Sequence, residues 1–246
     1  MSPEAYTEMA DVESRHWWFV GRRAILTCLL EDLRLPPDAT VLEIGAGTGG
    51  NLIMLSRFGQ VSAMEMDSNA REIATKKTGG RFDIRAGYCP EKIPFANEKF
   101  DLICLFDVLE HIEDDQGTLN AIGQMLSERG RVVLTVPAYQ WLWSFHDEFL
   151  HHKRRYSRME LLRRTDQAGF QLVRLSYFNT LLFPLAVLAR IKDRLVGGNK
   201  ASGTGTPPAL VNALFTRLFS AERFILGGMD LPFGVSLLAV MQKKGS

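Results

Sequence analysis

Short apolar runs alternate with longer segments of mixed polarity along most of the chain. From Thr40 onward the apolar runs are rich in β-branched and aliphatic residues, as in buried strands, and the segments between them carry apolar residues at helical spacing. The pattern predicts strands at residues 40–44, 61–66, 82–86, 100–106, 131–136, 170–177 and 235–242. It predicts helices at residues 19–33, 49–58, 69–77, 115–128, 157–169, 184–196 and 208–226. Strands and helices that alternate at this spacing predict a parallel sheet with helices on both faces.

The last predicted strand joins the sheet differently from the others. Residues 179–234 leave the carboxyl end of strand 170–177 and contain two predicted helices, so the chain re-enters the sheet antiparallel at residue 235. We therefore expect an α/β fold: a doubly wound, mostly parallel seven-stranded sheet with an antiparallel last strand and a two-helix insert before it. The expected parts are an N-terminal helical lid region (1–39), a cofactor-binding core (40–178), the helical insert (179–234) and the last strand of the core (235–246).

The helical insert contains an unusually apolar segment. Residues 181–189 are apolar on all sides, and basic residues follow at Arg190, Lys192 and Arg194. An apolar stretch with a basic edge can lie in a membrane interface or enclose a lipid tail. The alternative, slightly favoured, is that the insert helices pack on each other and on the sheet edge. In the predicted helix at residues 208–226 the polar residues share one face, opposite the apolar residues. Residues 197–206 are rich in Gly, Ser and Thr, a composition typical of a linker.

The composition narrows the class of protein. The formal net charge is +1 over 246 residues, so no basic field favours nucleic acid as a partner. Three cysteines are too few and too scattered for a disulfide framework or a zinc site, which fits a reducing compartment. The first residues are polar and acidic, unlike a signal peptide, and the longest apolar stretch is too short to span a bilayer. These features predict a soluble, cytoplasmic protein.

The first predicted strand runs into a glycine-rich turn at residues 45–50. Such a turn lets the backbone approach a nucleotide-like cofactor closely. Its spacing fits both the dinucleotide pattern G-x-G-x-x-G and the pattern G-x-G-x-G, so the turn alone leaves the cofactor open. Glu43, just before the turn, would repel a pyrophosphate but can hold an ammonium group through water or a backbone amide. Glu65, at the end of the second strand, stands where a carboxylate accepts both ribose hydroxyls of either cofactor.

At these residues the chain resembles the class I S-adenosylmethionine-dependent methyltransferases, in particular the type 11 and type 12 methyltransferase domains. The motifs that carry the resemblance lie at residues 41–49, 61–65, 93–95, 100–103, 106–111 and 130–137. The resemblance implies a Rossmann-like fold and S-adenosylmethionine as the cofactor. Many members carry an Asp that contacts adenine where this chain has Cys89 and its neighbours, so a backbone contact is expected there. The expected cofactor-binding residues are Glu43, Gly45, Ala46, Gly47, Gly49, Glu65, Met66, Cys89, Asp107 and Val108.

Three segments converge by connectivity at the ligand end of the sheet. They are the start of the first long helix, residues 138–156 and the insert. Aromatic side chains there can form a binding wall, and arginines suit a phosphate or carboxylate. As alternatives, the tryptophans pack in the core or a lid, and Arg154 and Arg155 form a solvated turn. The expected substrate-binding residues are Trp17, Trp18, Arg22, Trp143, Arg154, Arg155 and Tyr156.

Methyl transfer from a sulfonium is an in-line displacement, to which positioning of the reactants can contribute most of the catalysis. A hydroxyl acceptor also needs a base with a pKa near neutral, which points to histidine. His146 and His111 are the expected catalytic residues, with a packed His111 that shapes the pocket as the alternative. No metal is expected. A zinc site is not favoured, although four neighbouring residues could be considered as its ligands: His146, Asp147, His151 and His152.

The sequence favours a methyltransferase that acts on a small-molecule or lipid- or isoprenoid-linked acceptor, by O-methylation. The alternatives are an NAD-dependent oxidoreductase of Rossmann type and a cofactor-binding protein without turnover. Glu43, the antiparallel last strand and the lack of a Tyr-x-x-x-Lys pair all disfavour the oxidoreductase. Nucleic acid is not an expected substrate, because the chain has no Asn/Asp-Pro-Pro-Tyr/Phe motif. Peripheral contact with the inner face of a membrane, through residues 179–234, is the alternative to a purely cytoplasmic location.

Overall fold

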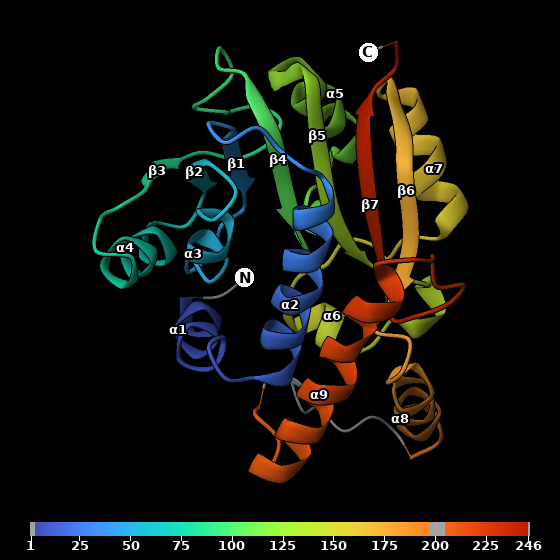
Figure 1. Ribbon diagram of the computed structural model, residues 1–246. Coiled ribbons are helices and arrows are strands. Elements are labelled where there is room, and N and C mark those ends of the chain that lie inside the picture. The colour runs from blue at the N-terminus through green and yellow to red at the C-terminus, as the bar shows by residue number, and fades with distance from the viewer. Residues whose placement is uncertain (1–2, 197–204, 246) are drawn as a thin grey trace.

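A computed structural model of the chain describes residues 3–196 and 205–245, whose strands form one mixed sheet (Figure 1). The strand order is β3-β2-β1-β4-β5-β7-β6. Strands β1 to β5 run parallel to one another, whereas β7 is antiparallel to both of its neighbours, β5 and β6. The predicted fold class is therefore confirmed. The strands are β1 Thr40–Ile44, β2 Gln60–Glu65, β3 Asp83–Ala86, β4 Phe100–Phe106, β5 Leu126–Pro137, β6 Phe170–Phe178 and β7 Ser236–Lys243.

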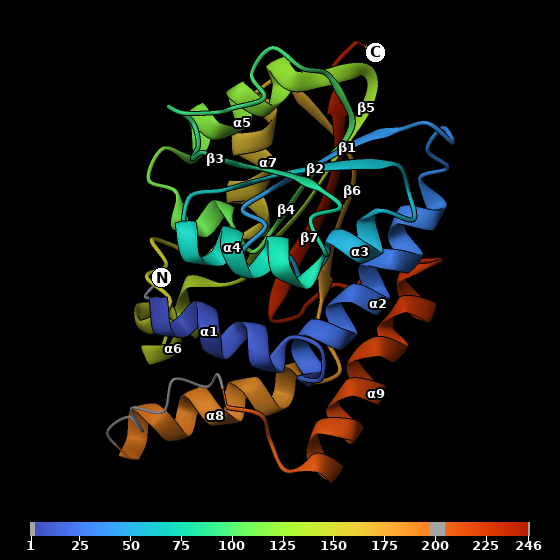
Figure 2. The ribbon, with the colours of Figure 1, turned by 90° about the vertical axis from the view of Figure 1, so that its left-hand side faces the viewer.

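Helices cover both faces of the sheet and its lower end (Figures 1 and 2). Helices α2, α3 and α9 lie on one face and α5 and α7 on the other, while α1 and α8 lie below the strands. The α-helices are α1 Pro3–Val12, α2 Trp17–Asp32, α3 Leu52–Leu55, α4 Ser68–Lys77, α5 Asp115–Met125, α6 Phe145–Phe149, α7 Arg158–Gln167, α8 Phe183–Val196 and α9 Ala209–Leu226. Two short 3-10 helices are η1 Leu109–His111 and η2 Gln140–Leu142.

Two predicted helices are shorter in the structure. The helix predicted at 49–58 is regular only over α3, because Gly49 has a left-handed φ of +78° and cannot start a helix. The helix predicted at 115–128 ends at Met125, because the buried Leu126 already pairs with Phe100 of β4. Strand β5 is accordingly longer than predicted. The predicted linker at 197–206 lies mostly outside the described residues.

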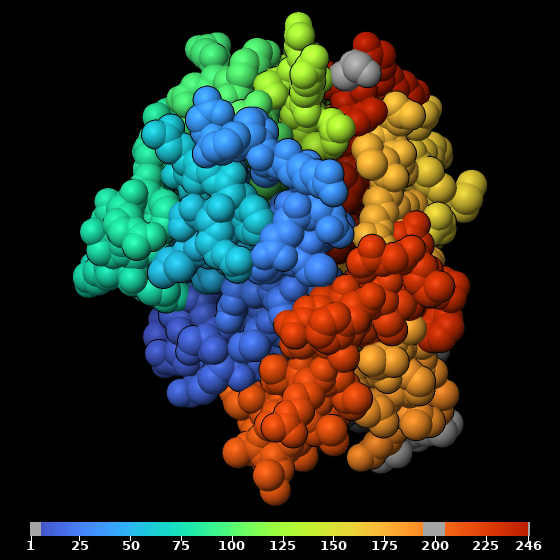
Figure 3. Space-filling view, viewed as in Figure 1, coloured from blue at the N-terminus to red at the C-terminus, as the bar shows by residue number. Residues whose placement is uncertain are grey.

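Helix α9 packs along α2 (Figure 3), and aromatic side chains form part of the contact. Trp18 stacks on Phe219 with ring centroids 5.2 Å apart, and Trp17 meets the same ring edge-on. The helices approach closely at Gly21, where a Cβ would lie 2.4 Å from the Phe219 ring. The side chain of Asn212 accepts a hydrogen bond from the backbone N–H of Trp17. The interhelical contact therefore uses aromatic and polar side chains together.

The outward face of α9 carries several apolar side chains beside Arg217. Leu210 is 87% exposed and Phe224 is 74% exposed, and Leu214 is also exposed. The polar residues Asn212 and Glu222 face inward instead, with Glu222 accepting a hydrogen bond from the backbone N–H of Leu181. Packing against α2 and the start of α8 decides this orientation. Within the described ranges, no helix is long and apolar enough to cross a bilayer.

Candidate functional site

A cavity of about 920 Å³ opens at the carboxyl ends of the central parallel strands. Its wall is formed by α1, α2, the glycine turn after β1, the ends of β2 and β4, α6 and α8. Figure 2 shows α1 and α8 below these strand ends, where the N-terminal region and the insert both contribute to the wall. Segments from the two ends of the chain thus enclose one compartment, as connectivity predicted for a doubly wound sheet.

The glycine turn forms one end of the cavity. Gly45 and Gly47 have φ values of +70° and +54°, a region that favours glycine, and both line the cavity. A Cβ on Gly45 would lie 2.7 Å from the side chain of Val108, so the turn also packs tightly against the end of β4. Gly49 does not line the cavity: a Cβ there would lie 3.0 Å from Cβ of Ala74 in α4. The prediction for Gly49 is corrected to a packing position between turn and helix.

Glu65 lies at the carboxyl end of β2, facing the turn. One carboxylate oxygen accepts a hydrogen bond of 2.8 Å from the N–H of Gly47, and the other accepts one of 2.9 Å from the N–H of Asp67. The hydroxyl of Tyr6 in α1 also donates to Glu65, at 3.4 Å. These bonds fix the carboxylate against the backbone of the turn, in the cavity wall. Ala46, Met66, Cys89 and Val108 also line the cavity.

Glu43 lies behind the turn rather than in the cavity wall. It is fully buried, and one of its oxygens accepts a hydrogen bond of 2.8 Å from the side chain of Asn51, which does line the cavity. Burial raises the pKa of Glu43 to about 7, against the opposing effect of the Asn51 hydrogen bond. Glu43 was predicted to hold an ammonium group through water or a backbone amide; in the structure its carboxyl group reaches the cavity wall through the side chain of Asn51 instead.

The raised pKa of Glu43 predicts a pH-dependent stability. A carboxyl whose folded pKa lies above its unfolded value of 4.5 stabilises the fold at low pH, and that contribution is lost as the pH rises through about 7. We expect the unfolding free energy of Glu43→Gln, relative to wild type, to rise by about 3 kcal/mol between roughly pH 4 and pH 8. Urea denaturation at several pH values measures this difference. The exposed Glu128→Gln is the control and should keep the wild-type profile; parallel profiles for all three proteins would refute the prediction.

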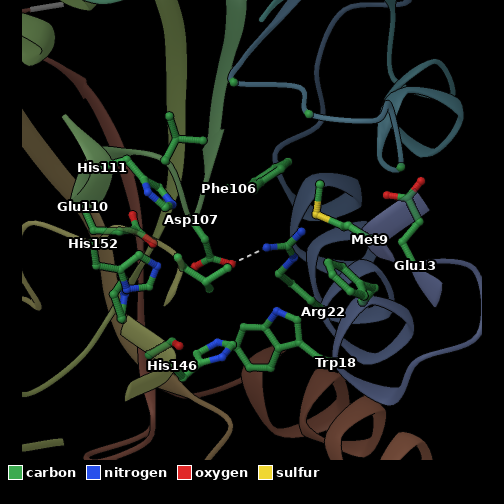
Figure 4. Close-up of a pocket in the computed structure, with 18 of the residues that line it drawn as sticks. Met9, Glu13, Trp18, Arg22, Phe106, Asp107, Glu110, His111, His146 and His152 are labelled. Atoms are coloured by element: carbon green, nitrogen blue, oxygen red, sulfur yellow. Dashed lines mark hydrogen bonds and ion pairs between the residues drawn. The ribbon is translucent and has the colours of Figure 1, made fainter. Parts of the chain in front are cut away.

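An ion pair joins the two sides of the cavity (Figure 4). The guanidinium of Arg22 in α2 donates to the carboxylate of Asp107, which follows β4. Asp107 has a φ of +57°, unusual for a residue with a side chain, and its N–H donates to the carbonyl of Thr135. Both residues line the cavity. The polar centre of the compartment thus depends on helix α2 as well as on the sheet.

Helix α1 contributes residues that the sequence analysis did not identify. Tyr6 and Met9 of α1 and Glu13, which directly follows the helix, all line the cavity and are spaced three and four residues apart, as on one helical face. The buried carboxylate of Glu13 accepts a hydrogen bond of 3.0 Å from the hydroxyl of Thr48 and pairs with Lys77 in α4. The helical spacing was the available signal, but only the fold shows that this face meets the glycine turn.

The predicted histidines lie in the wall away from the turn. His146 in α6 and His111 in η1 both line the cavity. Burial lowers the pKa of His111 to about 3, with a further contribution from His152, so its imidazole is neutral. The neighbouring Glu110 is completely buried, and its burial raises the pKa of that carboxyl well above its usual range. Neither Glu110 nor His152 was predicted as a site residue; both line the cavity.

The predicted substrate residues divide into two groups. Trp17, Trp18, Arg22 and Arg155 line the cavity, but the first two also pack on α9. Arg155 is held by a bidentate ion pair with the buried Asp147, at 2.7 and 3.0 Å. The other three lie outside the cavity wall: Trp143, Arg154 and Tyr156.

Tyr156 and Arg154 are structural in this fold. Tyr156 is fully buried, and its hydroxyl donates a hydrogen bond of 2.9 Å to Asp115 at the start of α5. Arg154 pairs with the same carboxylate at 3.0 Å. The prediction that they bind substrate is therefore corrected, because both side chains are used to join the segment after β5 to α5.

Comparisons with known proteins give one family. A methyltransferase-domain model matches residues 17–175, well over half of the chain. The chain is 26% identical over 162 residues to cycloartenol-C-24-methyltransferase 1 of Oryza sativa subsp. japonica, which covers 57% of this chain and 46% of that protein. The chain spans less than half the length of the curated relatives it matches.

Solved structures share the fold at low sequence identity. A chain in the complex between the Haloferax volcanii Trm112 methyltransferase activator and a methyltransferase matches with a TM-score of 0.64 at 18% identity, covering 99% of this chain and 95% of that one. Geranyl diphosphate C-methyltransferase from Streptomyces coelicolor A3(2) matches with a TM-score of 0.58 at 14% identity, covering 89% and 78%. At these identities the likeness shows the fold alone.

Proposed function

The chain belongs to the class I S-adenosylmethionine-dependent methyltransferase family, and on that premise we propose that it transfers the methyl group of S-adenosylmethionine to an acceptor oxygen inside the cavity. The observation that carries the proposal is the arrangement of the glycine turn and Glu65. The turn offers backbone without side chains at Gly45 and Gly47, and the Glu65 carboxylate stands beside it at the end of β2. A carboxylate in this position suits the ribose hydroxyls of a nucleoside cofactor, and the match to a methyltransferase-domain model favours S-adenosylmethionine over NAD.

Calorimetric titration with S-adenosylhomocysteine and with NAD tests the cofactor. We expect S-adenosylhomocysteine to bind with a stoichiometry of one and NAD to give no heat of binding. Binding of NAD without S-adenosylhomocysteine would overturn the proposal in favour of an oxidoreductase. The titration needs no acceptor, so it tests the cofactor alone.

For the acceptor, we propose a lipid- or isoprenoid-linked molecule. Leu182, Leu185 and Ala186 of the α8 region line the cavity, and Leu188 and Ile191 continue the apolar surface to the outside of the helix. An apolar surface that runs from the exterior into the cavity suits a long hydrocarbon chain. One relative is named for cycloartenol, and one solved structure of the same fold is named for geranyl diphosphate.

A mass-shift assay identifies the acceptor. Quinols, glycolipids and polyprenyl sugars are incubated with the protein and S-adenosylmethionine, and the product is searched for one added methyl group. Co-sedimentation with anionic vesicles tests whether the apolar surface of α8 meets a membrane. Methylation of water-soluble acceptors only, without vesicle binding, would contradict the lipid-linked acceptor.

We propose His146 as the general base. It lies in the cavity wall on α6, whereas the pKa of about 3 makes His111 a poor proton acceptor near neutral pH. Replacing His146 with Ala should lower kcat by about 10²- to 10⁴-fold for a hydroxyl acceptor. The affinity for S-adenosylhomocysteine should stay unchanged. His151→Ala, at an exposed histidine, is the matched control. Equal kcat values for the two variants would show that His146 is not the general base.

A further inference from the structure

Three potential metal ligands meet in the wall of the cavity. Glu110 and His111 come from η1, directly after β4, and His152 comes from the segment between α6 and α7. Each offers one ligand atom, and these atoms lie within 4.8 Å of one another. Among the described residues, this is the single group of His, Cys, Asp and Glu side chains placed to hold a metal ion. Figure 4 shows the three side chains together on the side of the cavity opposite Met9 and Glu13.

Glu110 contributes the carboxyl group of this set. The residue is completely inaccessible to solvent, and neither carboxylate oxygen has a hydrogen-bond partner among the described residues. Buried polar groups in folded proteins are normally paired, because an unpaired one loses its interactions with water. A buried carboxyl group without a partner, with two imidazoles beside it, is an arrangement that a cation would complete by binding the carboxyl group in its deprotonated form.

The two histidines are already oriented. Nδ1 of His152 lies 2.9 Å from an oxygen of the buried Asp147, so the other ring nitrogen is the one available as a ligand. Metal-binding histidines commonly have such a carboxylate partner, which fixes the ring and its tautomer. The rings of His111 and His152 meet edge to face, with centroids 4.7 Å apart.

The backbone also fixes the distance between the two segments. The N–H of Lys153 donates a hydrogen bond of 2.8 Å to the carbonyl of Glu110. Arg155 holds Asp147 in place through its bidentate pair. The ligand group is therefore supported on both sides by rigid contacts.

We propose that Glu110, His111 and His152 bind a divalent first-row transition-metal ion, with Zn²⁺ as the reference ion. Two imidazoles and one carboxylate match the ligand sets of catalytic zinc and of non-haem iron, which keep further positions open. Tetrahedral bonds of about 2.1 Å to one ion separate its ligand atoms by about 3.4 Å, and the ligand atoms here lie within 4.8 Å of one another. Mg²⁺ fits poorly, because it prefers oxygen ligands. No metal was expected from the sequence, where His152 was considered only together with His146, Asp147 and His151.

The open positions of the ion would face the cavity, since all three ligands line it. An acceptor with an anionic or chelating oxygen could bind there. This use of the site rests on the proposed function, but binding of the ion does not.

Metal titration of the tag-free protein, without cofactor or acceptor, tests the proposal. We expect calorimetry to show binding of one equivalent of Zn²⁺ and bound Co²⁺ to give visible absorption bands. Mg²⁺ should displace neither of these two ions. In protein labelled with ¹⁵N in histidine, Zn²⁺ should shift the ring signals of two of the five histidines. Glu110→Gln, which keeps the side-chain shape, and His152→Ala should each weaken Zn²⁺ binding by about 100-fold or more.

The neighbouring His151→Ala is the matched control and should bind Zn²⁺ like wild type, because its exposed side chain is outside the group. Absence of a one-to-one complex in the wild-type protein would overturn the proposal, and so would wild-type affinity in both ligand variants. The wild-type spectra decide the matter even if a variant fails to fold. Failure of S-adenosylhomocysteine binding would instead count against the proposed function alone.

Discussion

Replacing Gly47 with Val should weaken S-adenosylhomocysteine binding by about 100-fold or more, which corresponds to about 2.7 kcal/mol. Gly47 has a φ of +54°, and its N–H donates to the carboxylate of Glu65. A Cβ built there meets only the end of the Met9 side chain, at 3.2 Å, so a valine would project into the cofactor end of the cavity instead of into the core. It would occupy cofactor space and pull the turn away from Glu65. Calorimetric titration measures the loss.

Gly79→Val is the matched control for backbone strain. Gly79 has a similar φ of +63°, but a Cβ there has no atom within 4 Å, and it lies outside the cavity wall. Both variants should lose comparable stability from the left-handed backbone, about 1–2 kcal/mol. Only Gly47→Val should lose cofactor affinity. If the two variants bind S-adenosylhomocysteine equally well, the turn does not hold the cofactor.

Replacing Arg155 with Met should lower the unfolding free energy by about 3–5 kcal/mol. Asp147 is completely buried, and Arg155 makes a bidentate pair with it while a third N–H donates to the carbonyl of Ala138. Although burial alone would raise it, hydrogen bonds from His152 and Arg155 hold the pKa of Asp147 well below its usual range. Methionine fills a similar volume but leaves the carboxylate buried without its main partner. Urea denaturation with a chelator present, which removes any contribution from metal binding, measures the loss.

The exposed pair of Arg57 and Glu31 provides the control for that variant. Its atoms are 3.0 Å apart, but the two side chains are 59% and 53% exposed, so Arg57→Met should change the unfolding free energy by about 0.5 kcal/mol or less. A loss in Arg155→Met no larger than this would mean that the other hydrogen-bond partners of Asp147, among them His152, are sufficient for the buried carboxylate. The predicted role of Arg155 in substrate binding would then become the better explanation for its position in the wall.

Much of the cofactor end of the site could be predicted from short stretches of sequence. The alternation of apolar runs and helical spacing gave the sheet and its order of elements, and the glycine turn and Glu65 both follow a strand end. Parallel strands place their carboxyl ends at one edge, so residues at those ends must meet. Gly49 and Glu43 were misplaced by this reasoning, because a motif does not show which of its residues face the ligand and which face a neighbouring helix.

The sequence by itself determined the fold class and the cofactor turn, because strand periodicity and glycine conformation are local properties. Only the tertiary structure decided that the polar face of α9 packs inward and that Tyr156 is buried. It also brought His152 together with Glu110 and His111, from which it is far away in the sequence. Such contacts depend on which segments pack against one another, and no local pattern in the chain contains that information.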